Sequence, residues 1–218
     1  MSMEKKLDFV MVTPFVDEIG LKKIDRILKS FSGLGMFPEI IFNDWGVFNL
    51  IRNKYSEFKK LSMGRLLNRM KRDPRIKFLK TNIPDYVKDH LKDSSLSIDW
   101  YKKFIIKNNI TRIELDNLTQ GIASDFSGKY FIKNISLYYP FGYLTTTRLC
   151  RFNYDRKKES PGFRINTDCK RYCKDMYAEV RYKGLEKEKI YVKGNTFFIK
   201  TERQIVNDRI NRIVFNHI

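Results

Sequence analysis

The chain has 218 residues, of which 43 are basic and 25 acidic, so its formal net charge is +18. An apolar fraction of 42% excludes a disordered chain, and no apolar run is long enough to span a membrane. The length favours one domain over residues 1–218. The first six residues lack the apolar core and cleavage site of a signal peptide, so we expect a cytoplasmic protein.

Strand-like apolar runs alternate with amphipathic helical patterns along the chain. In chain order, we expect strands at 7–12, 39–43, 61–64, 112–115, 131–139, 189–192, 196–200 and 212–216, and helices at 17–31, from 47 to 58 and at 98–108. Gly194 and Asn195 are typical of a hairpin turn. The alternation predicts an α/β fold with a largely parallel sheet, either a barrel or an open, doubly wound sheet. Neither a G-x-G-x-x-G motif nor a Walker loop is present, which disfavours nucleotide-binding folds.

Three cysteines lie within 24 residues, with the spacing Cys150-x18-Cys169-x3-Cys173. An odd number of thiols in a cytoplasmic chain argues against a disulfide framework. Thiols four positions apart share one face of a helical turn, and thiolates suit zinc or iron–sulfur clusters. Zinc would need a fourth Cys or His, and neither His90 nor His217 is near in sequence, which favours iron–sulfur chemistry. Ordinary core or surface cysteines are the alternative.

Polar residues follow several predicted strands, at the edge where βα folds place their sites. Asp44 could hold a ligand or cap the helix that follows it. Arg65 could bind a carboxylate or phosphate, or form a structural ion pair. Glu114 and Asp116 end one strand and could act as an acid/base pair if the geometry allows. Asp44, Arg65 and Glu114 are therefore the catalytic candidates.

Residues 54–80 hold ten basic and two acidic side chains. The stretch is interpreted either as an RNA-facing stripe or as a solvated surface. No Ser/His/Asp set or G-x-S-x-G elbow is visible, so serine hydrolysis has little support.

Four segments, taken in order, resemble peptidase family U-32, and particularly its small iron–sulfur members. These segments are 40–51, 63–75, 139–150 together with 168–173, and 192–196. The small members include accessory subunits of oxygen-independent ubiquinone hydroxylation, and larger relatives hydroxylate transfer or ribosomal RNA. The resemblance implies a TIM-like βα barrel. The chain begins at a segment similar to the family's third strand, so we expect an incomplete barrel of about six mainly parallel strands that lacks the first two βα units.

The resemblance also implies partners and a cofactor. An open barrel leaves two sheet edges, so we expect a homo- or hetero-oligomer that covers them. Cys150, Cys169 and Cys173 match the family's cluster ligands and imply a [4Fe–4S] cluster. The family's fourth cysteine is absent here, so the fourth ligand would be Asp44, Asp155, a partner chain or substrate. Such a cluster would be easily lost during aerobic purification.

The function implied by the resemblance is oxygen-independent hydroxylation, or a related modification, of an aromatic precursor or RNA base, by an enzyme or enzyme subunit. The alternative is a non-catalytic relative that binds RNA or protein. Peptidase activity ranks below both, despite the name of the family.

Overall fold

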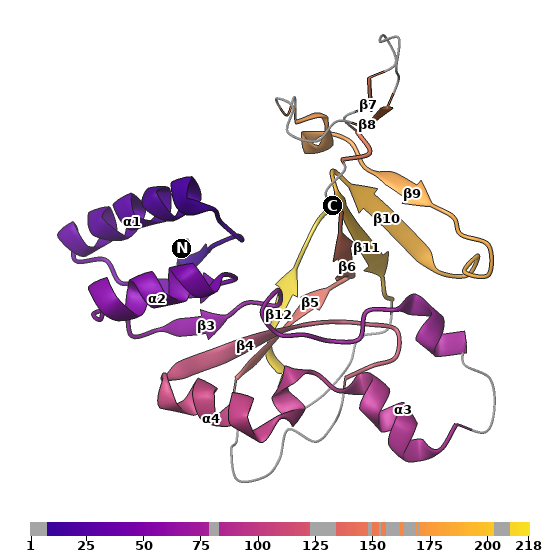
Figure 1. Cartoon of the computed structure of the whole chain (residues 1–218), viewed down its shortest axis with the longest axis horizontal. Helices are drawn as coiled ribbons and strands as arrows, with labels where there is room; N and C mark the ends of the chain where they lie inside the picture. The colour runs from indigo at the N-terminus through magenta and orange to yellow at the C-terminus, as the bar shows by residue number, and fades with distance from the viewer. Residues whose placement is uncertain are drawn as a thin grey trace, which may run out of the picture.

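The fold is described by a computed structural model, which covers residues 8–78, 83–122, 134–147, 150–152, 154–155, 162–163, 169, 171–202 and 210–218. Six strands form one parallel sheet in the order β1-β2-β3-β4-β5-β12 (Figure 1). The strands are β1 (Val10–Val12), β2 (Glu39–Phe42), β3 (Leu61–Met63), β4 (Ile110–Asp116), β5 (Ile135–Tyr139) and β12 (Ile210–Phe215). The prediction of an α/β fold with about six parallel strands is confirmed. Residues 7 and 131–133 of the predicted strands lie outside the described residues.

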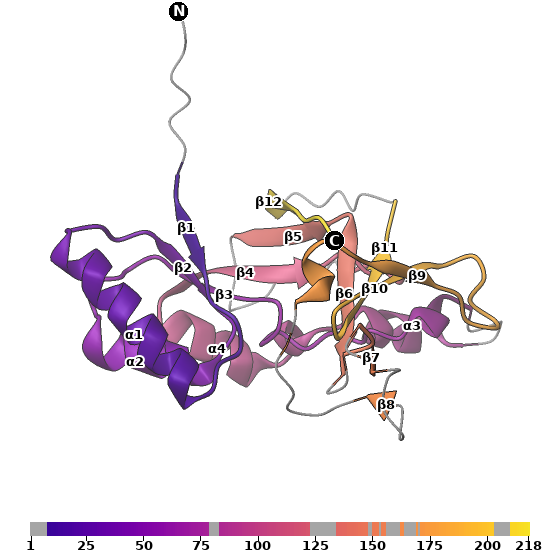
Figure 2. The same cartoon turned by 90° about the horizontal axis from the view of Figure 1, so that it is seen from above.

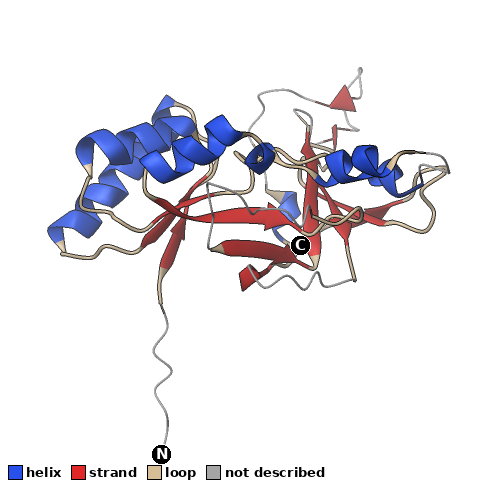
Figure 3. Cartoon of the chain, turned by 90° about the horizontal axis from the view of Figure 1, so that it is seen from below, coloured by secondary structure: helices blue, strands red, loops and turns tan. Residues whose placement is uncertain are grey.

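Helices cover one face of this sheet, as Figure 3 shows. The α-helices are α1 (Glu18–Gly33), α2 (Trp45–Lys54), α3 (Asp85–Lys92) and α4 (Asp99–Lys107), and short 3-10 helices are η1 (Pro74–Phe78), η2 (Ser95–Ser97) and η3 (Tyr172–Lys174). Apolar side chains at alternate strand positions, such as Phe42, Ile113 and Leu137, pack with Leu28 and Val47 from the helices. This alternation places the main core between the sheet and its helices.

The helix predicted to run from 47 to 58 ends at Lys54. Phe58 lies in the turn after the helix, and its side chain is still buried. The predicted ends of the helix at 98–108 are close to those of α4, where Asn109 has a left-handed φ of 53°. Within the described ranges, every helix is too short or too polar to cross a bilayer.

The opposite face of the parallel sheet is polar and concave. Arg212 on β12 donates two hydrogen bonds to the carboxylate of Glu39 on β2, at 2.9 and 2.7 Å, although three strands separate them. Ser62 on β3 also donates to Glu39, at 2.6 Å. The strand directions turn progressively from β1 to β5 (Figure 2), as expected for a strongly twisted sheet. The six strands therefore form a curled half-barrel with β1 and β12 at its edges.

A second sheet connects β5 to β12, in the position where a regular βα barrel has a helix. It consists of β6 (Phe141–Thr146), β9 (Ala178–Val180), β10 (Lys189–Lys193) and β11 (Thr196–Lys200), paired antiparallel in the order β6-β11-β10-β9. A separate two-stranded pair is formed by β7 (Tyr154–Asp155) and β8 (Gly162–Phe163). The predicted hairpin turn is confirmed, with Gly194 at a φ of 63° between β10 and β11. The separate sheet itself was not predicted.

Candidate functional site

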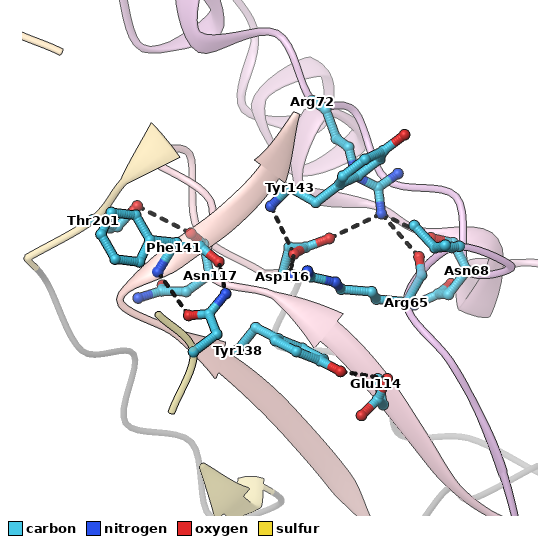
Figure 4. A network of polar contacts seen from close by, with 12 residues as sticks. Arg65, Asn68, Arg72, Glu114, Asp116, Asn117, Tyr138, Phe141, Tyr143 and Thr201 are labelled. Atoms are coloured by element: carbon cyan, nitrogen blue, oxygen red, sulfur yellow. Dashed lines mark hydrogen bonds and ion pairs between the residues drawn. The ribbon is translucent and has the colours of Figure 1, made fainter. Parts of the chain in front are cut away.

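Polar side chains converge at the carboxyl ends of β3 and β4 and at the start of β6 (Figure 4). Their centre is Asp116, the last residue of β4, which is fully buried. Arg65 donates from Nη1 to Oδ1 of Asp116 at 2.9 Å, and Arg72 donates from Nη2 to Oδ2 at 3.0 Å. The backbone N–H of Tyr143 donates to Oδ1 at 2.9 Å. One carboxylate thus links the loop after β3 to the first strand of the second sheet.

The loop that carries Arg65 depends on a close contact of the preceding Gly64. A Cβ atom at Gly64 would overlap the side-chain amide of Asn43. That amide is held on both sides, because its Nδ2 donates to the carbonyl of Thr13 at 3.0 Å and its Oδ1 accepts from the N–H of Leu66 at 3.1 Å. Glycine therefore lets the β3 loop approach β2 closely enough to direct Arg65 toward β4.

Both arginines also contact aromatic rings. The guanidinium carbon of Arg65 lies 3.8 Å from the ring centre of Tyr138, and that of Arg72 lies 5.1 Å from the ring centre of Tyr143. Their side chains are only 15% and 14% exposed. Pairing with a carboxylate and stacking on a ring together fix the position of each cation. The ion-pair interpretation of Arg65 is confirmed.

Glu114 lies two residues before Asp116 on β4, so both side chains point to the same face of the sheet. It is fully buried, and its Oε2 accepts a hydrogen bond of 3.1 Å from the hydroxyl of Tyr138. Burial raises the pKa of Glu114 to about 7, although the hydrogen bond from Tyr138 and the charge of Arg65 act in the opposite direction. Burial and the neighbouring Glu114 also raise the pKa of Tyr138. Glu114 can therefore gain or lose a proton near neutral pH.

Several buried polar atoms in the network of Glu114, Asp116 and Arg72 have no hydrogen-bond partner among the described residues. They are Oε1 of Glu114, Nε of Arg72 and both side-chain amide atoms of Asn68. Buried polar atoms are almost always paired in folded proteins, so a group of unpaired ones needs an explanation. A polar ligand or ordered water would satisfy them, and both are common at functional sites.

The structure separates the three catalytic candidates. Arg65 and Glu114 belong to one site, whereas Asp44 does not. Oδ1 of Asp44 accepts hydrogen bonds from the backbone N–H groups of Gly46 at 2.7 Å and Val47 at 3.2 Å. Asp44 is the N-cap of α2, so its helix-capping interpretation is confirmed.

Sequence reasoning missed Arg72, Asn68, Tyr138 and Tyr143 as members of the site. Arg72 was noted only as one of the basic residues at 54–80. At least four of these ten residues have carboxylate partners, namely Lys54, Arg65, Arg72 and Arg75. The stretch is therefore not a uniform stripe of free cations. One signal in the sequence could have indicated Tyr138. Side chains alternate along β5, so Tyr138 and Ser136 point to the same face of the sheet.

The cysteines are free, with Cys169 exposed and Cys150 and Cys173 half-buried. The expected helical turn shared by Cys169 and Cys173 is wrong. In the described part of this stretch, Tyr172–Lys174 forms a short 3-10 helix, and the left-handed φ of 55° at Arg171 prevents a helical turn from Cys169 to Cys173. Among the described residues, no three His, Cys, Asp or Glu side chains are grouped closely enough to hold a metal ion. Asp155 lies in β7, and its side chain is outside the described part.

Cys173 and Thr147 nevertheless both lie against the β10–β11 turn. Cys173 lies beside Gly194, where its Sγ would be 3.3 Å from a Cβ atom. Thr147, three residues before Cys150, exchanges hydrogen bonds of 2.8 and 2.9 Å with Asn195 of the same turn. Three free thiols have the donor chemistry that an iron–sulfur cluster requires. The cluster remains a prediction.

Comparisons with known proteins identify no relative of this chain. No family model matches it, and no significant match was found among curated proteins or solved structures.

Proposed function

We propose that the protein is a U-32-like enzyme or enzyme subunit that modifies an aromatic precursor or an RNA base at the carboxyl edge of its half-barrel. The observation that carries this proposal is Glu114, a fully buried carboxyl group with a pKa near 7. One of its own carboxylate oxygens, Oε1, is buried and has no hydrogen-bond partner among the described residues. Strongly shifted pKa values at such positions are typical of catalytic acids and bases.

The arrangement of the strands supports a shortened, TIM-like barrel. Six parallel strands follow one another in chain order and curl toward a common axis. Sites in βα barrels are built at the carboxyl ends of the strands, and Arg65, Asp116 and Tyr143 gather at that edge. The reaction therefore takes place at the edge where βα barrels normally carry their active sites.

In this proposal, each residue of the site has a distinct role. Glu114 exchanges a proton with the substrate, and the hydroxyl of Tyr138 orients the carboxyl group. Arg65 stabilises negative charge that develops on the substrate. Asp116 is a positioning residue, because it holds Arg65 and Arg72 without itself being exposed.

The cofactor belongs to the same proposal. Cys150, Cys169 and Cys173 would hold a [4Fe–4S] cluster, with a non-cysteine group or an external molecule as fourth ligand. The free state of the three thiols supports it, as does the position of Cys173 and Thr147 against one turn. Such a cluster supplies electron-transfer or substrate-ligating chemistry when it is bound.

We also propose that the protein works as a homo- or hetero-oligomer. Both edges of the half-barrel expose large apolar side chains. Phe9 and Val12 at the β1 edge are 57% and 54% exposed, and Phe215 on β12 is 62% exposed. Strand edges of this kind favour association. Light scattering measures the mass of the protein, both for the purified chain alone and after incubation with host-cell extract. A monomeric mass in both cases would contradict the proposed oligomer.

The function is tested in cells that lack the gene and carry a wild-type or variant copy. Mass spectrometry of digested RNA and of small aromatic metabolites identifies the product. The wild-type chain should restore one modified species that neither Glu114→Gln nor Cys169→Ala restores. Glu179→Gln, on the exposed strand β9, is the matched control and should behave as wild type. Full restoration by Glu114→Gln would refute the role of Glu114.

The alternative is a non-catalytic protein that binds RNA or another protein. The net charge of +18 favours it. In that case, cells that lack the gene should contain every modified species that wild-type cells contain. Binding of RNA would weaken steeply as salt concentration rises.

A further inference from the structure

A cavity of about 660 Å³ lies between the segment after β3 and the second sheet. Arg72, which binds Asp116 at the candidate site, also lines this cavity. The cavity is therefore adjacent to the candidate site and shares one side chain with it. Its volume is within the range of small-molecule binding sites, roughly 300–1,000 Å³.

The floor of the cavity is apolar. Leu144 of β6, Ile190 of β10 and Phe197 of β11 line it, and Ile190 and Phe197 are almost completely buried. The guanidinium carbon of Arg151 lies 5.2 Å from the ring centre of Phe197. The guanidinium group covers a face of this ring, so the flat surface open to a planar ligand is the outer face of the guanidinium group itself.

The rim of the cavity is cationic. Arg72, Arg75, Arg151 and Lys183 line it, against one acidic residue, Asp73. Arg72 is paired with Asp116, and Arg75 is paired with Asp73. Among the residues that the structure describes, no carboxylate pairs with Arg151 or Lys183. Arg151 and Lys183 are both exposed, so they can bind an anion beside the apolar floor.

We propose that this cavity binds a planar ring that carries an oxyanion, either a phosphate or a carboxylate. The ring lies against Leu144 and the outer face of the Arg151 guanidinium group, and the oxyanion contacts N–H groups of Arg151 and Lys183. Such a ligand exists as a free small molecule and as a nucleotide within an RNA strand. Arg72 is the side chain that the cavity shares with the candidate site, and the role of this ligand as substrate rests on the proposed function.

Calorimetric titration of the full chain tests the inference. The probes are adenosine 5′-monophosphate, 4-hydroxybenzoate, an unstructured oligoribonucleotide of about eight nucleotides, neutral adenosine and inorganic phosphate. We expect at least one of the first three to bind once per chain with a Kd below about 1 mM, and about tenfold more tightly than adenosine or phosphate. Tighter binding of the oligonucleotide than of the monophosphate indicates an RNA source, and the reverse order indicates a free small molecule.

Two variants locate the binding. Arg151→Gln should weaken it by about tenfold or more, because a charge-assisted contact is lost. Thr145→Trp should block it, because the exposed side chain of Thr145 lines the cavity and a β-strand tolerates tryptophan. Arg52→Gln, on α2, is the charge-matched control and should leave binding unchanged.

The inference is overturned if no ring-bearing oxyanion binds below about 1 mM, or if Arg151→Gln and Thr145→Trp weaken binding no more than Arg52→Gln does. Glu114→Gln separates this inference from the proposed function. The variant should bind the ligand normally and fail only in conversion.

Discussion

Arg212 on β12 and Glu39 on β2 form a bidentate ion pair across the concave face of the parallel sheet. Two guanidinium nitrogens lie 2.9 and 2.7 Å from the two carboxylate oxygens. The two strands are four steps apart in the sheet. In a flat sheet, four steps of 4.8 Å would separate them by about 19 Å, which two side chains cannot bridge in this geometry. The pair therefore exists only because the sheet curls, and it links the last strand to the second.

We expect Arg212→Gln to destabilise the protein by about 1–3 kcal/mol at pH 7, because it leaves the half-buried carboxylate of Glu39 without its main partner. Urea denaturation measures the change. Arg181→Gln is the matched control, because Arg181 is 86% exposed and its ion pair with Glu179 contributes little.

The same pair predicts a dependence on pH. Burial opposes ionisation of Glu39, but hydrogen bonds from Arg212 and Ser62 outweigh it and lower the pKa of Glu39. A lowered folded-state pKa contributes stability above the unfolded value of 4.5, and this stability is lost as the pH falls through the folded value. The cost of Arg212→Gln should therefore shrink at about pH 3. An equal cost at both pH values would show that the charge of Glu39 is not involved.

Glu114 predicts the opposite dependence on pH. Its pKa rises from 4.5 to about 7 on folding. Its stabilising contribution is complete below pH 4.5 and is lost as the pH rises through about 7. As the pH rises from 4.5 to above 7, the free energy of unfolding of wild type should fall by up to roughly 3 kcal/mol more than that of Glu114→Gln. Denaturation curves of both chains over this pH range measure the difference. Identical curves would mean that Glu114 ionises normally.

Asp116→Asn removes the partner of two arginines that are largely buried. We expect a loss of about 3–5 kcal/mol in the free energy of unfolding, because two buried cations lose their counter-charge. Asp73→Asn is the control. Asp73 is 41% exposed and pairs with an exposed Arg75, so its loss should cost less than about 1 kcal/mol. Comparable costs for the two variants would contradict the central position of Asp116.

Gly64→Ala tests the close contact beneath the Arg65 loop. The new methyl group would overlap the amide of Asn43, and we expect a destabilisation of about 1–3 kcal/mol. Gly33→Ala, at the end of α1, has open space around its added methyl group. That variant should be neutral or more stable by up to about 1 kcal/mol. Thermal unfolding distinguishes them.

Anaerobic purification tests the cluster. We expect about four iron atoms per chain and an absorbance band typical of iron–sulfur clusters. Replacement of Cys150, Cys169 or Cys173 by alanine should remove the iron, whereas Ser97→Ala should retain it. Zinc in place of iron, under the same conditions, would reject the cluster.

Local patterns in the sequence determined much of the fold. Apolar runs and helical periodicity predicted a strand at the position of each of the six parallel strands, and predicted helices α1, α2 and α4, because each pattern reflects burial within one element. Glycine at position 194 predicted the β10–β11 turn, since it tolerates the left-handed backbone found there. Strand alternation also placed Glu114 and Asp116 on one face.

Only the tertiary structure decided how distant segments meet. Arg65 and Asp116 are 51 residues apart, and Arg212 and Glu39 are 173 apart. Such contacts depend on which strands become neighbours and on how far the sheet curls, and no local period encodes either. The role of Asp44 was undecided in the sequence for a related reason. An aspartate after a strand can cap a helix or bind a ligand, and only the position of its carboxylate against the backbone N–H groups of α2 shows that it caps.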